Sequence, residues 1–275
     1  MNAADQATTF DAHERRLWTG RALAYERTFA KLCAYPAPML LDAAGVHAGV
    51  TALDVGTGSG TVAALACARG AVVTAVDAER GMVELTRRRV PAADVRHGLL
   101  PDLPFPDGVF DAAVANFVIN HVGDPAAALG ELRRLVRPGG RIAVTVWPHP
   151  PPPLQRLWWQ AIEAAGARRP DSVPRVAAEL DFERSTDGLT RLLSDAALTE
   201  LTGETITWEH RAAPDEWWSG AVNGIGTSGL IIASQTPEMI AQIKGHYDRL
   251  TAAYLGSDGL LGLPTAAVLA AGRVG

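Results

Sequence analysis

Long apolar runs and basic clusters are both missing from this sequence of 275 residues. No segment reaches the roughly 18 consecutive apolar residues that a membrane-spanning helix needs. The N-terminal residues also lack the charged start and apolar run of a secretory leader. The formal net charge is −5, and the three arginines at 87–89 are typical of a solvated helix face. We therefore expect a cytoplasmic protein that acts on neither membranes nor nucleic acids.

Cysteine is also scarce, since the chain contains only Cys33 and Cys67. Both lie among apolar residues, which is typical of reduced thiols in a cytosolic core and not of a disulfide framework. No cluster of histidines and carboxylates has the spacing of metal ligands, so we expect no metal. Hydrophobic residues make up 48% of the chain, enough to bury a full core.

The most informative segment is LDVGTGSG at 53–60, which follows a predicted strand at 51–55 and opens a predicted helix at 61–69. Its alternate residues are glycines, namely Gly56, Gly58 and Gly60. Glycines let the backbone turn tightly and let a ligand approach without a Cβ in the way. The helix N-terminus then presents free N–H groups to that ligand. The pattern predicts a nucleotide-type cofactor.

Two missing features narrow the choice of nucleotide. A P-loop needs Gly-Lys-Ser/Thr after the glycines, and none follows. The G-x-G-x-x-G pattern of nicotinamide dinucleotide sites needs a third glycine, and counted from Gly56 the chain has Thr61 there. Counted from Gly58 it has Ala63, which only the looser form of the pattern allows. Asp54, two places before the first glycine, would repel a pyrophosphate but suits a ligand that carries an amine.

A second acidic residue, Asp77, ends the next predicted strand, 17 residues after Gly60. That is near the distance at which a βαβ unit places an acid beside a bound ribose. A carboxylate there can accept hydrogen bonds from both ribose hydroxyls. The alternative is that Asp77 only caps the helix that starts near Glu79, because Asp is a favoured cap.

Four motifs follow one another at consistent spacing between Leu53 and Val146. They are L-D-V-G-T-G-S-G, A-V-D-A-E-R-G-M, D-L-P-F-P-D-G-V-F-D and L-V-R-P-G-G-R-I-A-V. With these motifs the chain resembles the class I S-adenosylmethionine-dependent methyltransferases. Within that class it is similar to the small-molecule group that includes the ubiquinone and menaquinone biosynthesis enzymes.

The resemblance implies S-adenosyl-L-methionine as the cofactor. The three glycines would cradle its methionine part, Asp54 would help to hold its amine, and Asp77 would bind its ribose. Four further residues would line the cofactor by the same resemblance: Ala78, Met82, Asn116 through its backbone, and Tyr25, an N-terminal aromatic residue that closes over it.

One departure from the family concerns the adenine. The family usually has an Asp a few residues before D-L-P-F that accepts a hydrogen bond from the adenine amino group, and this chain has Leu99 there. We expect apolar contacts from Leu99 and Leu100 in its place. The Asn/Asp-Pro-Pro-Tyr/Phe sequence of enzymes that methylate base amines in nucleic acids is also missing.

Predicted strands and helices alternate along the chain, which indicates an α/β fold, Rossmann-like and doubly wound, with a mostly parallel seven-stranded sheet. Strands are expected at 51–55, 72–76, 94–97, 110–115, 141–147 (entered through a turn at 138–140), 204–210 and 265–271. Further helices are expected at 154–165, 186–196 and 237–254. We expect a single domain, 1–275, made of N-terminal helices (1–48), a cofactor-binding core (49–147) and a substrate-side half (148–275). A helical cap should be inserted at about 213–263, before the last strand.

The best candidate for a general base is His121, which follows the fourth strand at the edge where ligands bind in such sheets. Histidine titrates near neutral pH and is the commonest general base. The alternatives are that His121 packs or caps the helix at Asp124, and that transfer proceeds by proximity alone. His149, at the exit of the fifth strand, is the second candidate. Five aromatic residues could form a pocket for a flat substrate or shield the sulfonium by a cation–π contact: Trp18, Tyr25, Trp147, Trp217 and Trp218. The alternative, which is favoured for any single one of them, is packing in the core or the cap.

We expect methyl transfer from S-adenosylmethionine to a small organic molecule, with O-methylation ahead of N- and C-methylation. Alanine- and arginine-rich usage with few lysines favours a bacterial biosynthetic pathway. Two alternatives stay open: an enzyme that binds the cofactor but catalyses another step, such as a cyclisation, and a non-catalytic partner with the same fold. The oligomeric state is open.

Overall fold

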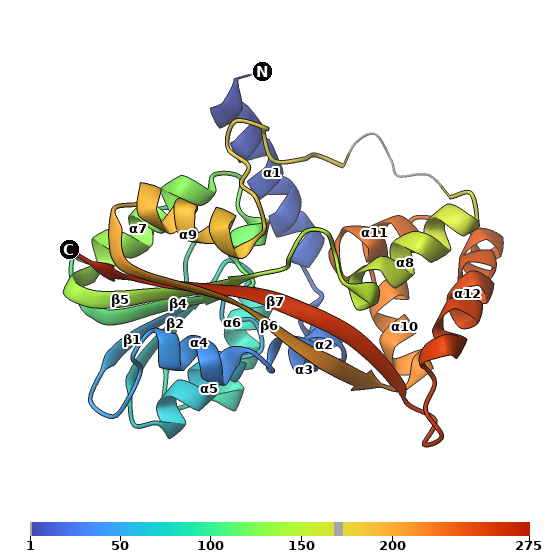
Figure 1. Ribbon diagram of the computed structural model, residues 1–275, viewed down its shortest axis with the longest axis horizontal. Coiled ribbons are helices and arrows are strands. Elements are labelled where there is room, and N and C mark those ends of the chain that lie inside the picture. Colours follow the sequence, from blue (N-terminus) through green and yellow to red (C-terminus); the bar gives the residue numbers. More distant parts are fainter. Residues whose placement is uncertain (1, 168–172) are drawn as a thin grey trace.

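A computed structural model describes residues 2–167 and 173–275 and has a seven-stranded sheet at its centre (Figure 1). The strands are β1 (Thr51–Val55), β2 (Val72–Asp77), β3 (Asp94–His97), β4 (Phe110–Asn116), β5 (Val136–Val146), β6 (Leu198–Ala212) and β7 (Leu261–Val274). They lie side by side in the order β3-β2-β1-β4-β5-β7-β6, with only β7 antiparallel to its neighbours. The predicted fold class is confirmed.

Helices cover both faces of the sheet, which is why the central strands read as continuous apolar runs. One face carries α4 (Ala37–Ala43), α5 (Thr61–Ala68) and α6 (Arg80–Arg89), and the other carries α7 (Pro125–Leu135) and α9 (Thr186–Asp195) (Figure 1). Each face has its own buried cluster, with Leu40 and Val62 in one and Leu129 and Leu193 in the other. Two apolar layers therefore hold the carboxyl ends of β1, β2 and β4 at one edge.

The entry into β5 differs from the expected turn at 138–140. These residues belong to the strand and form an irregularity in it, because Phe110 pairs with Val136 while Ala112 pairs with Arg141. A Cβ on Gly140 would lie 2.4 Å from the carbonyl oxygen of Asp111. The close approach of the two backbones thus requires glycine at this position, and the bulge lets β5 start five residues earlier than expected.

Several other helices form a group beside one end of the sheet. They are α8 (Pro153–Ala164), α10 (Pro214–Val222), α11 (Gly226–Ala233) and α12 (Pro237–Thr251), which continues into the short 3-10 helix η2 (Ala252–Tyr254). The last three α-helices lie between β6 and β7, as the expected insertion requires, and α12 packs on α8. α11 was not predicted, because its glycines at 226 and 229 favour a loop. That this region is a cap within a single domain stays a prediction.

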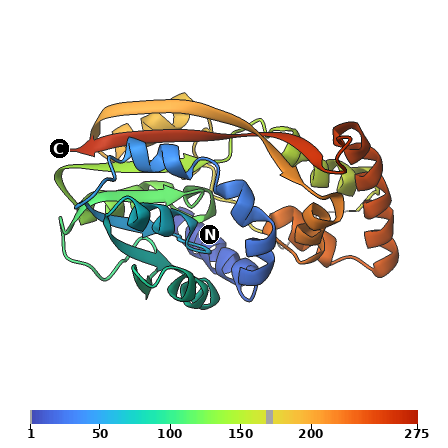
Figure 2. The same ribbon diagram turned by 90° about the horizontal axis from the view of Figure 1, so that it is seen from below.

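The N-terminal helices lie between the sheet and this helical group, as Figure 2 shows in dark blue. They are α1 (Ala3–Trp18), α2 (Ala22–Arg27) and α3 (Phe29–Cys33). α1 contacts α11, and α2 contacts both α10 and α6. Within the described part of the chain, no helix has the length and apolar character that crossing a membrane requires.

Candidate active site

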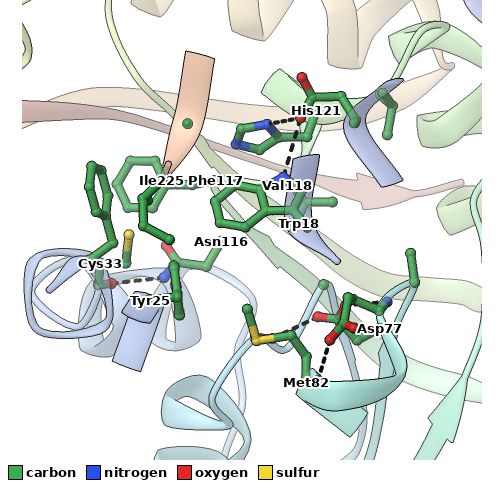
Figure 3. Close-up of a pocket in the computed structure, with 18 of the residues that line it drawn as sticks. Trp18, Tyr25, Cys33, Asp77, Met82, Asn116, Phe117, Val118, His121 and Ile225 are labelled. Carbon is green, nitrogen blue, oxygen red and sulfur yellow. Dashed lines mark hydrogen bonds and ion pairs between the residues drawn. The ribbon is translucent and has the colours of Figure 1, made fainter. Parts of the chain in front are cut away.

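A cavity of about 410 Å³ opens at the carboxyl ends of β1, β2 and β4, beneath the N-terminal helices (Figure 3). It contains ten of the thirteen residues that the sequence places at the site: Tyr25, Gly56, Gly58, Asp77, Ala78, Met82, Leu99, Leu100, Asn116 and His121. Segments that are far apart in the chain therefore meet here, and three of the expected residues lie elsewhere.

Asp54, Gly60 and His149 do not line this cavity. The Asp54 carboxylate lies behind the glycine loop, where Oδ2 accepts a hydrogen bond from the Thr57 hydroxyl at 2.7 Å. Gly60 forms the N-cap of α5 and would direct a Cβ at Thr86. His149 lies past the end of β5, and its backbone N–H donates to the carbonyl of Arg184. The structure thus places these three residues outside the cavity lining, and their expected roles at the site stay predictions.

The glycine loop needs its glycines for two separate reasons. Gly56, Gly58 and Gly60 have φ values of +65°, +57° and +83°, in the region that side chains disfavour. In addition, a Cβ on Gly56 would lie 2.4 Å from a methyl carbon of Val118, and one on Gly58 would lie 3.2 Å from the Tyr25 ring. The loop thus presents bare backbone to the cavity, as a cradle for a ligand must.

Asp77 lies at the end of β2 and accepts two backbone hydrogen bonds, from Gly58 N–H at 2.8 Å and Glu79 N–H at 2.9 Å. Burial is the main cause that raises the pKa of Asp77 to about 6. The cap of α6 is Glu79, whose carboxylate accepts from Met82 N–H at 2.7 Å. The interpretation of Asp77 as the helix cap is therefore wrong, and its carboxylate remains on the cavity wall.

Asp54 is the most deeply buried acid of this region, with 2% of its surface exposed. Burial raises its pKa to about 7, while the hydrogen bond from Thr57 opposes the shift. Its oxygen Oδ1 has no hydrogen-bond partner. An unpaired buried carboxylate oxygen is costly, and an ammonium group is the kind of donor that satisfies it. Because Asp54 lies behind the loop and outside the cavity lining, its carboxylate fits an amine-bearing ligand through its negative charge and not by direct contact in this structure.

Leu99 and Leu100 line the cavity from the loop between β3 and β4. A network behind them holds this loop in place. The Leu103 N–H donates to Glu131 at 2.8 Å, and Arg134 donates to the carbonyls of Leu103 and Phe105. The apolar wall that the sequence predicts for a purine is thus fixed by two polar side chains of α7.

Asn116 uses its whole side chain for structure. Its amide nitrogen donates to the carbonyl of Cys33 at 2.8 Å (Figure 3). Its amide oxygen accepts from the Thr145 hydroxyl at 2.7 Å. Only its backbone is left for a ligand, as expected. Cys33 lines the cavity as well and is not purely a core thiol. Burial raises the pKa of its thiol to about 12, which leaves it protonated and unreactive at neutral pH.

His121 forms a contact that the sequence did not reveal. Its Nδ1 lies 2.9 Å from Oε2 of Glu14, and the same oxygen accepts a hydrogen bond from Nε1 of Trp18 at 3.2 Å (Figure 3). Glu14 is 7% exposed and comes from α1, 107 residues away in the chain. The cap of α7 is Asp124, so the interpretation of His121 as a helix cap is wrong.

The rest of the cavity has aromatic walls. Of the five expected residues, Trp218 lies outside and packs against Tyr247, with 5.0 Å between the ring centroids. The aromatic residues of the lining are Trp18, Tyr25, Phe29, Phe117, Trp147, Trp158, Trp159 and Trp217. Phe117 stacks on Trp147 at 3.8 Å and has a φ of +59°, a strain of the kind that is stored at functional sites.

Among residues 2–167 and 173–275, no group of three or more His, Cys, Asp or Glu side chains is arranged to hold a metal ion. The cavity instead combines three surfaces: a glycine loop with Asp77 beside it and Asp54 behind it, an apolar wall at 99–100, and an aromatic chamber that contains a histidine paired with a glutamate. This arrangement is suited to hold an amine-bearing nucleoside beside a second, apolar molecule.

Comparison with known proteins agrees with this geometry. A family model described as a methyltransferase domain matches residues 53–144. A demethylmenaquinone methyltransferase of Paenarthrobacter aurescens is 32% identical over 191 residues, which cover 65% of this chain and 76% of that protein.

Solved structures show the same fold at lower identity. YcgJ of Bacillus subtilis is 21% identical with a TM-score of 0.56, over 87% of this chain and 97% of that chain. A geranyl diphosphate methyltransferase in complex with SAM is 21% identical with a TM-score of 0.50, over 88% of this chain and 85% of that chain. The chain therefore belongs to the class I S-adenosylmethionine-dependent methyltransferases, and S-adenosyl-L-methionine is its cofactor.

Proposed function

We propose that this enzyme methylates a hydroxyl group of an apolar, ring-bearing small molecule, and that His121 is its general base. The observation that carries the proposal is the pairing of His121 with Glu14 inside an aromatic chamber, 2.9 Å apart. The other acid–base side chains of the lining are mainly carboxylates, namely Asp11, Glu14, Asp77 and Glu79, and Asp77 belongs to the cofactor side of the cavity. A bacterial biosynthetic pathway is the setting that we propose, on the amino-acid usage of the chain.

The cofactor half of the proposal follows from the glycine loop. The backbone at Gly56 and Gly58 would cradle the methionine part of the cofactor. Asp77 would accept hydrogen bonds from its ribose hydroxyls, and the charge of Asp54 would attract its amine. Ala78, Met82, Leu99 and Leu100 would enclose the adenosine, while Tyr25 would close over it. Gly60 would contribute only by ending the loop, since it lies outside the cavity.

When bound, the cofactor would supply a methyl group on a positively charged sulfur: an electron pair of the acceptor would form the new bond to this carbon as the carbon–sulfur bond breaks and S-adenosylhomocysteine leaves. A hydroxyl is a weak nucleophile until its proton leaves. Glu14 only accepts hydrogen bonds, so it binds the N–H at Nδ1 of His121 and leaves Nε2 free to take that proton. The protonated imidazole is then stabilised by the same carboxylate.

The substrate half follows from the chamber. Its walls are aromatic and largely apolar, and its polar groups besides the His121 end include the neutral side chains of Gln155, Thr227 and Ser228. Such walls favour a flat, uncharged molecule. C-methylation is a second candidate, favoured by the name of the Paenarthrobacter relative, a demethylmenaquinone methyltransferase, because a reduced quinone ring offers carbon as well as oxygen to a methyl donor. His121 has the same task in both reactions, since each releases a proton.

The test is a substrate screen with purified enzyme and S-adenosylmethionine. The panel consists of reduced naphthoquinones, simple phenols and aromatic amines. Formation of S-adenosylhomocysteine and of a methylated product is followed by mass spectrometry, and carbon NMR of the product separates O- from C-methylation. Turnover of phenols or quinols supports the proposal. Turnover of amines alone contradicts it, and a product formed without S-adenosylhomocysteine points to a non-methylating step.

A further inference from the structure

We propose that helix α1 carries a positioning residue for the base: Glu14 fixes the tautomer and the ring orientation of His121, and it does so only while α1 is docked. The inference rests on the proposed role of His121, because a fixed tautomer matters only if that ring moves a proton. Nothing near His121 in the sequence supplies this partner, since Glu14 precedes it by 107 residues.

The hydrogen bond between His121 and Glu14 has one direction in the proposed arrangement. A carboxylate offers only acceptor atoms, so the Nδ1 that faces Glu14 Oε2 at 2.9 Å carries the proton. In a neutral imidazole the other nitrogen, Nε2, is then the acceptor. The His121 side chain is 32% exposed, while that of Glu14 is 9% exposed, so the carboxylate is enclosed and the ring faces the cavity.

Glu14 is itself held in place by a neighbour on α1. The indole N–H of Trp18 donates to the same oxygen at 3.2 Å, which restrains the carboxylate from the next turn of α1. The Trp18 ring also meets the His121 ring edge to face, with 5.3 Å between centroids and an angle of 89° between planes. The imidazole is therefore held both by a hydrogen bond and by an aromatic contact, each of which comes from α1.

Helix α1 packs against the segment that contains His121. Asp11, one turn before Glu14, accepts a hydrogen bond from the backbone N–H of Gly123 at 2.7 Å. The backbone of Ala7 lies so close to Gly123 that an added Cβ would be 2.4 Å from its carbonyl oxygen. α1 thus rests on the segment that contains His121, two residues before Gly123.

The same helix contributes to the cavity wall through Asp11, Glu14, Arg15 and Trp18. Covering the cavity and orienting the base are therefore coupled in one element. If α1 leaves the 119–123 segment, the cavity loses part of its wall and His121 loses its carboxylate in a single event. The docked helix both excludes water and holds the base in the proton-accepting tautomer.

The experiment reads the tautomer directly and needs no substrate. The protein is labelled with nitrogen-15 histidine, and long-range proton–nitrogen spectra are recorded at about pH 8, with His121→Asn used to assign the signals of His121 among the seven histidines. We expect a proton on Nδ1 and none on Nε2 in the natural protein. A proton on Nε2 alone, or on both nitrogens, would overturn the proposal.

Three variants test the cause. Glu14→Leu removes the acceptor while filling similar space, and we expect the preference of His121 for one tautomer to be lost. Glu14→Gln keeps an acceptor oxygen and should restore the preference at least in part. Gly123→Ala keeps both side chains unchanged but pushes α1, which carries Glu14, away from the segment that contains His121. It should therefore have the same effect as Glu14→Leu and speed up amide exchange throughout α1. Gly130→Ala, where an added Cβ meets nothing within 4 Å, is the matched control.

An unchanged tautomer in Glu14→Leu would refute the role of Glu14. An unchanged tautomer in Gly123→Ala would refute the dependence on docking, whether or not α1 exchanges faster. Should Glu14→Leu not fold, the tautomer of the natural protein and of Gly123→Ala still decides. A failure of the proposed function can be told apart from a failure of this inference. If His121→Asn keeps its activity, His121 is not the general base, but the tautomer measured for His121 in the natural protein is unaffected.

Discussion

The carboxylate of Asp77 accepts a hydrogen bond from the backbone N–H of Gly58, with 2.8 Å between oxygen and nitrogen. The acid that ends β2 and the middle glycine of the loop are thus joined directly. The N–H of Glu79 holds the other carboxylate oxygen at 2.9 Å, so the side chain is restrained at both oxygens. Each oxygen keeps a free lone pair, and the group is already placed to accept the hydroxyls of a ribose.

Replacing Asp77 should therefore weaken cofactor binding more than it weakens folding. We expect Asp77→Ala to lower the affinity for S-adenosylmethionine by tenfold or more, which corresponds to about 1.4 kcal/mol. Calorimetric titration measures it, and Asp195→Ala, at an exposed position at the end of α9, is the control. Equal affinities of natural protein and Asp77→Ala would exclude a ribose contact.

The two buried acids predict opposite effects of pH on stability and on binding. Burial raises the pKa of Asp54 to about 7 and that of Asp77 to about 6, both above the ordinary value of 3.8. Between about pH 4 and 7 the folded protein binds protons that the unfolded chain releases. These two groups therefore lower the free energy of unfolding as the pH rises through that range, which urea unfolding of the ligand-free protein measures.

Cofactor binding should change in the other direction. A carboxylate that attracts an ammonium group must be ionised, so affinity for S-adenosylmethionine should increase as the pH rises from about 5 to about 7.5. Asp54→Asn should remove the part of this dependence that lies near pH 7. A pH-independent affinity in the natural protein would show that neither acid changes its charge when the cofactor binds.

Gly56→Ala separates strain from steric overlap. The substitution forces a Cβ into a backbone with φ of +65° and places it 2.4 Å from Val118. Gly49, with φ of +83° and nothing within 4 Å of an added Cβ, offers the same strain without the overlap. Backbone strain should cost both alanine variants about 1–2 kcal/mol of stability in urea unfolding. Gly56→Ala should lose more than Gly49→Ala because it also overlaps Val118. Only Gly56→Ala should also abolish cofactor binding, and equal binding in the two would argue against a cradle at this loop.

His121→Asn tests the base. The asparagine amide can still donate to Glu14 as Nδ1–H does, but it has no basic nitrogen in the place of Nε2. On the first substrate that turns over, we expect kcat to fall about a hundredfold, the lower end of what a general base contributes, with little change in cofactor affinity. His149→Asn should leave kcat unchanged, because His149 lies outside the cavity. An active His121→Asn would favour transfer by proximity alone.

The cofactor side of the site was predictable because its residues belong to short continuous motifs at strand ends, such as 53–60 and 77–82. A loop conformation and a strand end are local properties, and both leave a pattern in the sequence. The partner of His121 leaves none. Glu14 lies on a helix whose pattern indicates only one apolar face, and its pairing depends on how α1 docks after folding.

The chamber was only partly predictable for a related reason. Phe29 and Trp158 line the cavity from α3 and α8, yet in sequence they have the spacing of ordinary core residues. Trp218 was expected beside its neighbour Trp217, but adjacent residues on a helix point about 100° apart, and the ring of Trp218 faces α12. Which residues of an amphipathic helix face a cavity is decided by packing between elements that are distant in the chain.

Leu99 offers a test of the adenine wall by gain of affinity. Its side chain lines the cavity and is 37% exposed, so replacing it with an acid buries little charge. In related enzymes an Asp near this place accepts a hydrogen bond from the adenine amino group. Leu99→Asp should therefore bind S-adenosylhomocysteine about fivefold more tightly, as expected for one added hydrogen bond of about 1 kcal/mol. Calorimetric titration measures the change.

Two controls show whether the gain in affinity comes from a hydrogen bond to the adenine amino group. Leu99→Ala removes the apolar contact without adding an acceptor, and it should bind less tightly than the natural protein. The inosine analogue of S-adenosylhomocysteine has no amino group on its purine, so Leu99→Asp should show no gain with it. A gain of equal size with both ligands would mean that the new charge attracts the ligand's ammonium group through space. The purine would then lie elsewhere than against 99–100.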